Sequence, residues 1–334
     1  MDPPTPSPDS SPPAPPPQAP PRRTDHHRWG DRAFYGLVAA FGISIVGLAA
    51  AIVGILAYSS RASFQAFGWT FLWGTVWNPT SADRGPFGVV PFVAGTLITS
   101  AIGLVIAIPL ALGAAIFLTT HCPRWLRGPV GTAIELLAAV PSVIYGFWGL
   151  YILHPYMEKT VEPGLKQYLG WTGLFAGTPV GLDVLTAGII LAVMVVPTIC
   201  AVSRDTLLAV PQAQKEAALS LGATEWETTR VASIPYARSG IIGGIILGLG
   251  RAMGETMAVT MVIGNSDKIP TSLLSQGQTI ASLIANELLS NNGPLQASAI
   301  LEAGLVLLLI SLLVNVSARL LVWRVVRTGG GIVE

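Results

Sequence analysis

Two charged side chains interrupt a long apolar stretch in the C-terminal third of the sequence. Arg251 and Glu255 lie four residues apart within residues 239–264, which are otherwise rich in Gly, Ile, Met and Ala. Charged side chains at membrane depth are costly, and they often mark the path of an ion or substrate. The guanidinium of arginine is a planar, permanently charged donor that suits an oxyanion, and a nearby carboxylate can orient it. We therefore interpret the pair as candidate substrate-pathway residues.

Small residues precede this pair at regular intervals. Gly240, Gly244 and Gly248 follow one another at four-residue steps. On a continuous helix, Arg251 and Glu255 would extend the face of these glycines, with the arginine roughly 18 Å deep in the bilayer. Two interpretations stay open. Either the glycines let helices pack closely and the charges neutralise each other, or this face, including Gly244 and Gly248, lines a substrate pathway.

No other side chains are spaced for catalysis or for metal binding. The sequence contains four His and two Cys residues, and they form neither an H-E-x-x-H motif nor a pair of C-x-x-C motifs. The G-x-x-x-x-G-K-S/T loop that cradles nucleotide phosphates is also absent from the sequence. We therefore expect no metal, no cofactor and no catalytic residue. The net charge of +1 gives no indication of a nucleic-acid partner.

The elements that would position these residues are membrane-spanning helices. Hydrophobic residues make up 51% of the 334-residue sequence and charged residues only 11%, a composition typical of polytopic membrane proteins. Six apolar runs are each long enough for the roughly 20 residues that a helix needs to cross a bilayer. We therefore predict an all-α fold with about six transmembrane helices in a lipid bilayer. The predicted spans are 34–57, 89–118, 129–152, 181–203, 239–264 and 298–322.

The sequence before the first span has a different composition. Residues 1–33 are rich in Pro, Ser and Asp and end in several Arg residues, so we predict a disordered tail with a basic anchor. Residues 34–328 are predicted to form the transmembrane domain. Lys and Arg concentrate in the loops on the same side as the tail, which by the positive-inside rule places both termini in the cytoplasm.

A polar connection, residues 205–238, separates the fourth and fifth predicted spans. Pro211 can begin a helix because the first position needs no N–H, and Gly222 can end it with a left-handed cap. A capping-box sequence then begins at Thr224 and predicts a second short helix. We expect Pro235 to end that second helix. The loop is therefore predicted to hold two short helices on the cytoplasmic side, joined at the glycine.

The first of these helices carries a motif. Glu216, Ala217 and Ala218, followed by Gly222, resemble the E-A-A-x-x-x-G loop of the permeases of binding-protein-dependent ABC importers. Further along the loop, Ile234-Pro235 resembles the end of the family's I-x-L-P pattern. The match departs at Ala232, where that family usually has a larger aliphatic residue. The resemblance implies a coupling helix that docks on an ATP-hydrolysing subunit, with the small alanines allowing close contact. An ordinary amphipathic loop helix is the alternative, since E-A-A alone is common in helices.

Further segments resemble one branch of that family. Residues 250–259, Gly-Arg-Ala-Met-Gly-Glu-Thr-Met-Ala-Val, and residues 140–146, Val-Pro-Ser-Val-Ile-Tyr-Gly, are similar to the phosphate-importer permeases of the PstC type. Residues 71–73 and 77–79, in the first outer loop, resemble the same branch. By this resemblance, the Arg and Glu of the first segment match residues implicated in transport.

The resemblance implies a type I ABC importer permease fold and a subunit that does not hydrolyse ATP itself. It also implies a complex with a second permease subunit of the PstA type, ATPase subunits of the PstB type and an extracytoplasmic phosphate-binding protein of the PstS type. Such a complex would translocate inorganic phosphate across the cytoplasmic membrane of a prokaryote by alternating access.

Other functions stay open at this point. The substrate could be another oxyanion, or the chain could be the sister PstA-type subunit, although Met-Ala-Val at 257–259 favours the PstC type. A secondary transporter that works alone more often has inverted repeats and further buried acids. A membrane enzyme needs converging acid, base or metal groups. We find neither pattern in the sequence.

Overall fold

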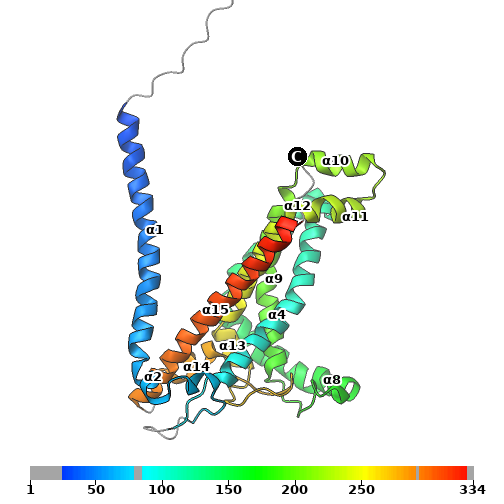
Figure 1. Cartoon of the computed structure of the whole chain (residues 1–334). Coiled ribbons are helices and arrows are strands. Elements are labelled where there is room, and N and C mark those ends of the chain that lie inside the picture. Colours follow the sequence, from blue (N-terminus) through cyan, green and yellow to red (C-terminus); the bar gives the residue numbers. More distant parts are fainter. Residues whose placement is uncertain (1–24, 79–84, 291–292, 329–334) are drawn as a thin grey trace, which may run out of the picture. The chain divides into compact units, whose positions relative to one another are not determined.

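The computed structural model describes residues 25–78, 85–290 and 293–328 of the chain. These residues form helices and connecting loops, and the described part contains no strand beyond two isolated bridges (Figure 1). Most of the predicted tail, residues 1–33, lies outside the described residues. Its last part is helical, because α1 (Asp25–Ser59) begins before the predicted boundary.

Long apolar helices confirm the prediction of an all-α membrane protein. Five helices are long and apolar enough to cross a bilayer, and there are six spans if one sharply bent helix pair counts as a span. In chain order these are α1, α4 (Val90–Ile116), the bent pair that starts with α5 (Arg124–Ala139) and α6 (Ser142–Trp148), α9 (Val184–Leu208), α12 (Ile234–Gly254) and α15 (Pro294–Thr328).

The chain divides into two compact units, Met1–Val53 and Gly54–Glu334. The described part of the first unit is α1 as far as Val53, and its described side chains are almost all exposed. The other helices belong to the second unit. We call its two ends the α10 end and the α8 end (Figure 1). The helices that mark them are α10 (Gln212–Ser220) and α11 (Glu225–Thr228) at one end, and α8 (Glu162–Leu169) and α14 (Ile280–Glu287) at the other.

Short helices cover the α8 end next to the last turns of α1. They are α2 (Arg61–Phe67) and α3 (Thr70–Trp73). Phe71 of α3 is buried in an apolar cluster with residues of α14 and α15, whereas Trp69 and Trp73 are exposed. Exposed indole rings at the end of a membrane span are typical of the headgroup level of a bilayer.

The third predicted span, 129–152, is not one straight helix. The structure bends the chain by 90° between α5 and α6, at Val140 and Pro141. A residue before proline disfavours the α conformation, and Val140 is extended with a ψ of 131°. Beyond α6 the chain continues through η2 (Gly149–Leu153), α7 (His154–Tyr156), η3 (Met157–Val161), α8 and η4 (Gly170–Thr172).

The fifth predicted span, 239–264, differs from the structure at both ends: the helix begins earlier than predicted and is interrupted before residue 264. Pro235 does not end the short helix before it, because α11 runs through a π-helical turn, η5 (Thr229–Ser233), into α12. Proline is tolerated there because it lies in the first turn of α12. At the other end the helix stops at Gly254, and α13 (Met257–Val262) is a separate helix.

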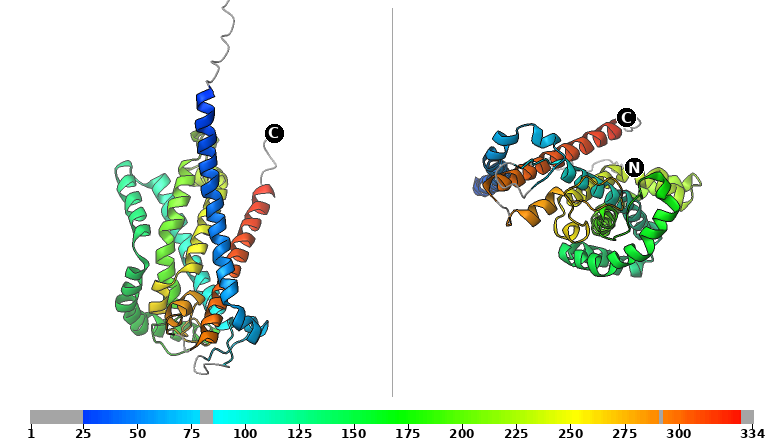
Figure 2. Two further views of the ribbon diagram at one scale, coloured as in Figure 1. Left: turned by 90° about the vertical axis from the view of Figure 1, so that its left-hand side faces the viewer. Right: turned by 90° about the horizontal axis from the view of Figure 1, so that it is seen from below.

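Helix α9 forms the centre of the second unit and packs against α4, α5 and α12 (Figure 2). On α4, Ala107, Ala111 and Ala115 recur every fourth residue and are fully buried. A Cβ atom added to Gly188 of α9 would lie 2.5 Å from Cγ2 of Ile102. Small residues at such positions let two membrane helices approach closely. The α4–α9 contact therefore leaves no room for larger side chains.

Both cysteines of the chain belong to this core. Cys122 follows the π-helical turn η1 (Phe117–His121) at the end of α4, and Cys200 lies in α9. Both are buried, and neither forms a disulfide.

Two fully buried carboxyl groups meet where α9 begins. Oδ1 of Asp183 accepts a hydrogen bond from the Thr186 N–H (2.7 Å), and Oε2 of Glu162 accepts from the N–H groups of Val180 (2.9 Å) and Gly181 (3.0 Å). The second oxygen of each carboxyl has no hydrogen-bond partner among the described residues. Burial, together with the nearby Glu162, raises the pKa of Asp183 from 3.8 to about 7, although the bonds from Thr186 oppose the shift.

We predict that Asp183 makes the stability of the protein depend on pH. A carboxyl whose pKa is raised in the folded state stabilises the fold most at low pH, and this contribution declines between about pH 4 and pH 7. Replacing Asp183 with Asn removes the titration and keeps the helix cap. The midpoint temperature of thermal unfolding, measured by tryptophan fluorescence of the purified protein, should therefore fall less steeply with rising pH in Asp183→Asn than in the parental protein.

The matched control is Asp205→Asn, which removes an exposed carboxyl near the other end of α9. This control should keep the pH dependence of the parental protein. If the unfolding temperature of Asp183→Asn depends on pH as steeply as that of the parental protein, Asp183 is not the titrating group.

Candidate functional site

Arg251 lies in the last turn of α12, with its side chain half-buried between three helices. Nη1 donates to Oγ1 of Thr198 in α9, and Nη2 donates to the carbonyl oxygen of Ala138 in α5, both at 3.4 Å. Thr198 lies near the middle of α9, so the guanidinium is at mid-depth in the span. A guanidinium has five N–H donors, and two long bonds leave several of them for a ligand. Sequence analysis did not identify Thr198.

The carbonyl that meets Arg251 is available because α5 ends early. In a continuous helix, Ala138 would accept a hydrogen bond from the N–H of Ser142. The extended backbone at Val140 and the 90° bend at Pro141 remove that bond. Irregular backbone at membrane depth is tolerated where it is buried in protein or lines a cavity, and it provides polar groups to a substrate site.

Tyr145 closes the corner between α5 and α6. Its hydroxyl donates to the carbonyl of Leu137 at 2.8 Å, and the Val140 N–H donates to the same carbonyl at 3.3 Å. Pro141, the usual helical partner of this carbonyl, has no N–H. One residue later, a Cβ atom added to Gly146 would lie 3.1 Å from Cα of Ala258 in α13. The tyrosine fixes the bend, and the glycine allows α6 and α13 to touch. Sequence analysis assigned no role to either residue individually.

The prediction that Arg251 and Glu255 share one face of a continuous helix is wrong. The helix ends at Gly254, and Glu255 has an extended backbone with a ψ of 128°. Its Oε1 accepts a hydrogen bond from the N–H of Ala258 (3.3 Å) in the first turn of α13. Within the part of the chain that the structure describes, no ion pair joins Arg251 to a carboxylate. The arginine is therefore a charged group whose described partners are neutral oxygen atoms.

The glycine stripe of α12 faces α9. A Cβ atom on Gly244 would lie 3.2 Å from Cβ of Val202, and one on Gly248 would lie 2.8 Å from Cγ1 of Ile199. A Cβ atom on Gly240 would clash with Thr206. These contacts are the close packing that sequence analysis gave as one alternative. A direct role of Gly244 and Gly248 in a substrate pathway stays a prediction.

A neighbouring face of α12 is not covered by any of the described residues. A Cβ atom on Gly250 or Gly254 would meet no other atom within 4 Å. Leu247 and Met257, on either side of them in the sequence, are 58% and 52% exposed. Arg251 therefore lies between a tightly packed helix on one side and an uncovered apolar face on the other.

The predicted helix–turn–helix in the polar loop is confirmed. Helix α10 follows Pro211, and the chain turns at Gly222, whose φ is +87°. The capping box at α11 is complete, since the Thr224 N–H donates to Oε2 of Glu227 (2.8 Å) and the Glu227 N–H donates to Oγ1 of Thr224 (3.3 Å). Because α11 continues through η5 into α12, the second helix of this loop and Arg251 belong to one uninterrupted run of helix, Glu225–Gly254, and α10 packs against the start of that run.

The predicted coupling residues lie on the surface of the α10 end. Glu216, Ala217 and Gly222 are exposed, and Ala218 is half-buried. Leu221, next to the turn, is 89% exposed. Exposed apolar side chains of this kind, together with small residues, are typical of a docking surface.

Comparisons with known proteins agree with this architecture. The sequence profile of the family described as "Binding-protein-dependent transport system inner membrane component" matches residues 107–327. The chain is also similar to the "Phosphate transport system permease protein PstC" of Pasteurella multocida, with 48% identity over 87% of this chain and 91% of the relative. The protein of the same name from Mesorhizobium japonicum is 44% identical over 90% of this chain and 92% of the relative.

Solved structures agree on the fold. A bacterial alginate ABC transporter, solved in complex with an alginate pentasaccharide-bound periplasmic protein, matches 89% of this chain and 98% of its own chain, with a TM-score of 0.59 and 17% identity. At that identity the match concerns the fold alone. The family match and the close relatives together cover the broken spans, the polar loop and Arg251. This chain therefore belongs to the family of binding-protein-dependent transport system inner membrane components, as a permease of the PstC type.

Proposed function

We propose that this chain is a membrane-spanning subunit of an ATP-driven importer that moves inorganic phosphate across the cytoplasmic membrane of a prokaryote by alternating access. The observation that carries the proposal is Arg251, a permanent cation at mid-depth whose described partners are two neutral oxygens. A buried charge needs compensation, and a passing anion supplies it. The names of the PstC relatives support phosphate as that anion.

Arg251 would bind the anion by exchanging weak bonds for strong ones. Its bonds to Thr198 and Ala138 are both 3.4 Å long. Charge-assisted bonds to phosphate oxygens are shorter and about twice as strong, and the guanidinium can form two of them in parallel. Because the competing contacts are neutral oxygens and not an ion pair, the guanidinium can give them up for the anion. Glu255, held by α13, would limit how tightly the anion is bound.

A second permease subunit, of the PstA type, would complete the pathway. The uncovered face of α12 at Leu247, Gly250 and Gly254 supports this assignment, because an apolar face beside a charged group in a membrane needs a protein partner or lipid. The Arg251 site would then lie near the boundary between two subunits. A phosphate-binding protein of the PstS type would deliver phosphate from the extracytoplasmic side of the membrane.

ATPase subunits of the PstB type would dock on α10, through Glu216, Ala217 and Ala218. The continuous helix from α11 to α12 supports the transmission of movement from this surface. From Ile234 to Arg251 it extends for roughly 25 Å at 1.5 Å per residue. Helix α10 packs against α11 and η5 at the start of this continuous helix, so a displacement of α10 would be passed to the arginine through that contact.

The first test concerns the substrate. Cells that lack this subunit should lose high-affinity uptake of radiolabelled phosphate and regain it when the parental chain is restored. Arsenate, which has the same charge and shape as phosphate, should compete more strongly than sulfate or molybdate. Phosphate would not be the substrate if phosphate uptake were the same with and without this chain, while uptake of sulfate or molybdate required the chain.

A second test concerns Arg251. Arg251→Lys should assemble normally and lower uptake by roughly 10- to 100-fold, because an ammonium does not reproduce the planar fork and the loss of a charged hydrogen bond amounts to about 1.5–3 kcal/mol. Glu255→Gln keeps an oxygen for the Ala258 N–H and should alter uptake without abolishing it. The double variant with Leu at both positions should be stable and inactive, and uptake near the parental rate in that variant would contradict the assignment.

A third test concerns the coupling surface. Glu216→Lys, or a bulky Phe at Ala217, should abolish uptake and release the ATPase subunits in detergent, because both positions are exposed and serve docking rather than folding. The amount of the chain in the membrane should not change. Glu158→Lys, the same charge reversal at a partly exposed position near the α8 end, is the control and should keep the ATPase bound. Retention of the ATPase by both α10 variants would show that docking occurs elsewhere.

A further inference from the structure

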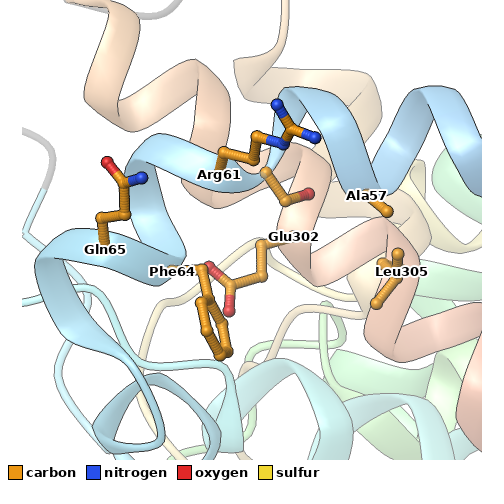
Figure 3. A pocket seen from close by; sticks show the side chains of 7 residues that line it. Ala57, Arg61, Phe64, Gln65, Glu302 and Leu305 are labelled. Carbon is orange, nitrogen blue, oxygen red and sulfur yellow. The ribbon is translucent and has the colours of Figure 1, made fainter.

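A pocket of about 360 Å³ lies at the α8 end, where the last turns of α1, helix α2 and helix α15 meet (Figure 3). It is far along the sequence from Arg251 and shares no residue with that site. Its lining residues are Ala57, Ser60, Arg61, Phe64, Gln65, Glu302 and Leu305. The pocket combines one acid, one base and an apolar wall.

The acid is Glu302, which lies inside a membrane span and is only 6% exposed. Its Oε2 has no hydrogen-bond partner among the described residues. The Ser63 hydroxyl is its nearby donor and is itself buried without a formed hydrogen bond. A carboxylate has about four acceptor positions, so a single hydroxyl cannot satisfy it. The pocket therefore holds a buried carboxyl that requires further donors, and a cationic donor suits it best.

The base is Arg61, which is exposed and lies 4.5 Å from the ring centroid of Tyr58. Figure 3 shows its guanidinium directed away from the Glu302 carboxyl, which points toward Phe64. No ion pair joins Arg61 to Glu302 in the described part of the chain. The pocket therefore presents a negative and a positive group that do not neutralise each other.

Apolar side chains connect these charges to the membrane. Phe64 is 53% exposed, and Ala57 and Leu305 complete the wall. The exposed rings of Trp69, just before α3, and Trp73, at its end, follow in the sequence, as is typical of the headgroup level. A ligand at this depth can place charged groups in the pocket and hydrocarbon along its wall, which is the arrangement of a phospholipid rather than of a soluble amine.

We propose that this pocket binds the headgroup of phosphatidylethanolamine. Its primary ammonium has three N–H donors for Glu302, and its phosphate, two carbons away, meets the guanidinium of Arg61. The acyl chains continue along Phe64 and Leu305 into the bilayer. The inference does not depend on the transported substrate, because the pocket is separate from Arg251.

The chemistry distinguishes this lipid from its relatives. Phosphatidylcholine carries the same charges, but its quaternary ammonium has no N–H and cannot satisfy the Glu302 carboxyl. Phosphatidylglycerol has the phosphate but no cation, so it leaves the carboxyl uncompensated. The pocket therefore selects for N–H donors on a cation rather than for charge alone.

The test uses the complete, delipidated transporter complex and lipids with identical acyl chains. Native mass spectrometry and thermal unfolding should detect binding of phosphatidylethanolamine about tenfold tighter than binding of phosphatidylcholine, as expected for one charge-assisted hydrogen bond. The mono- and dimethylated headgroups, which lose one N–H at a time, should bind with intermediate affinity. If phosphatidylethanolamine, its mono- and dimethylated forms and phosphatidylcholine all bind equally, the proposal is overturned. This holds both where another lipid covers the pocket and where a second protein subunit does.

Variants separate the two contacts. Glu302→Gln should bind phosphatidylethanolamine and phosphatidylcholine equally, and Arg61→Gln should weaken both while keeping the preference for the primary ammonium. Glu158→Gln, an acid-to-amide change away from the pocket, should behave like the parental protein. A Glu302→Gln complex that keeps the preference would also overturn the proposal. If that variant fails to assemble, the methylation series on the parental complex decides alone.

Discussion

Arg251 is held by the hydroxyl of Thr198 and the carbonyl of Ala138, at a point where two of the three helical spans that meet are interrupted. The bend at Pro141 frees the carbonyl. Thr198 follows Pro197 within α9. The end of α12 at Gly254 places the arginine in a last turn instead of mid-helix. In a bilayer, where each unsatisfied backbone group costs several kcal/mol, such breaks persist only when neighbouring groups replace the lost bonds.

The rest of the second unit supports these contacts of Arg251 by close packing, but only on the side of α12 that faces α9. Alanines and glycines bring α4, α9 and α12 together with little space between their backbones. Tyr145 and Glu255 each satisfy a backbone group that a break exposes. The uncovered side of α12 has no such support from the residues that the structure describes. Arg251 therefore lies between a rigid frame on one side and an open face on the other.

The sequence predicted the helices well and their interruptions poorly. Apolar runs give the number of spans because the bilayer sets their length, and the loop helices were predicted because Gly222 and the capping box at Thr224 act locally. Hydropathy does not reveal the breaks at Val140 and Glu255, since apolar residues continue on both sides of each. Pro141 ends a helix, whereas Pro235 does not, because the latter lies in a first turn that follows a π-helical turn. Thr198 and Tyr145 are ordinary residues in the sequence, and only the fold brings them to the site.

The two buried cysteines have a practical consequence for chemical labelling. Cys122 and Cys200 are the only cysteines in the sequence, and both are shielded in the core and unpaired. Maleimide reagents react with accessible thiolates, so the folded chain offers them almost no background. A cysteine introduced on the uncovered face of α12, at Gly250 or Gly254, becomes a single reporter of whether water or a partner reaches that face, without first removing the native thiols.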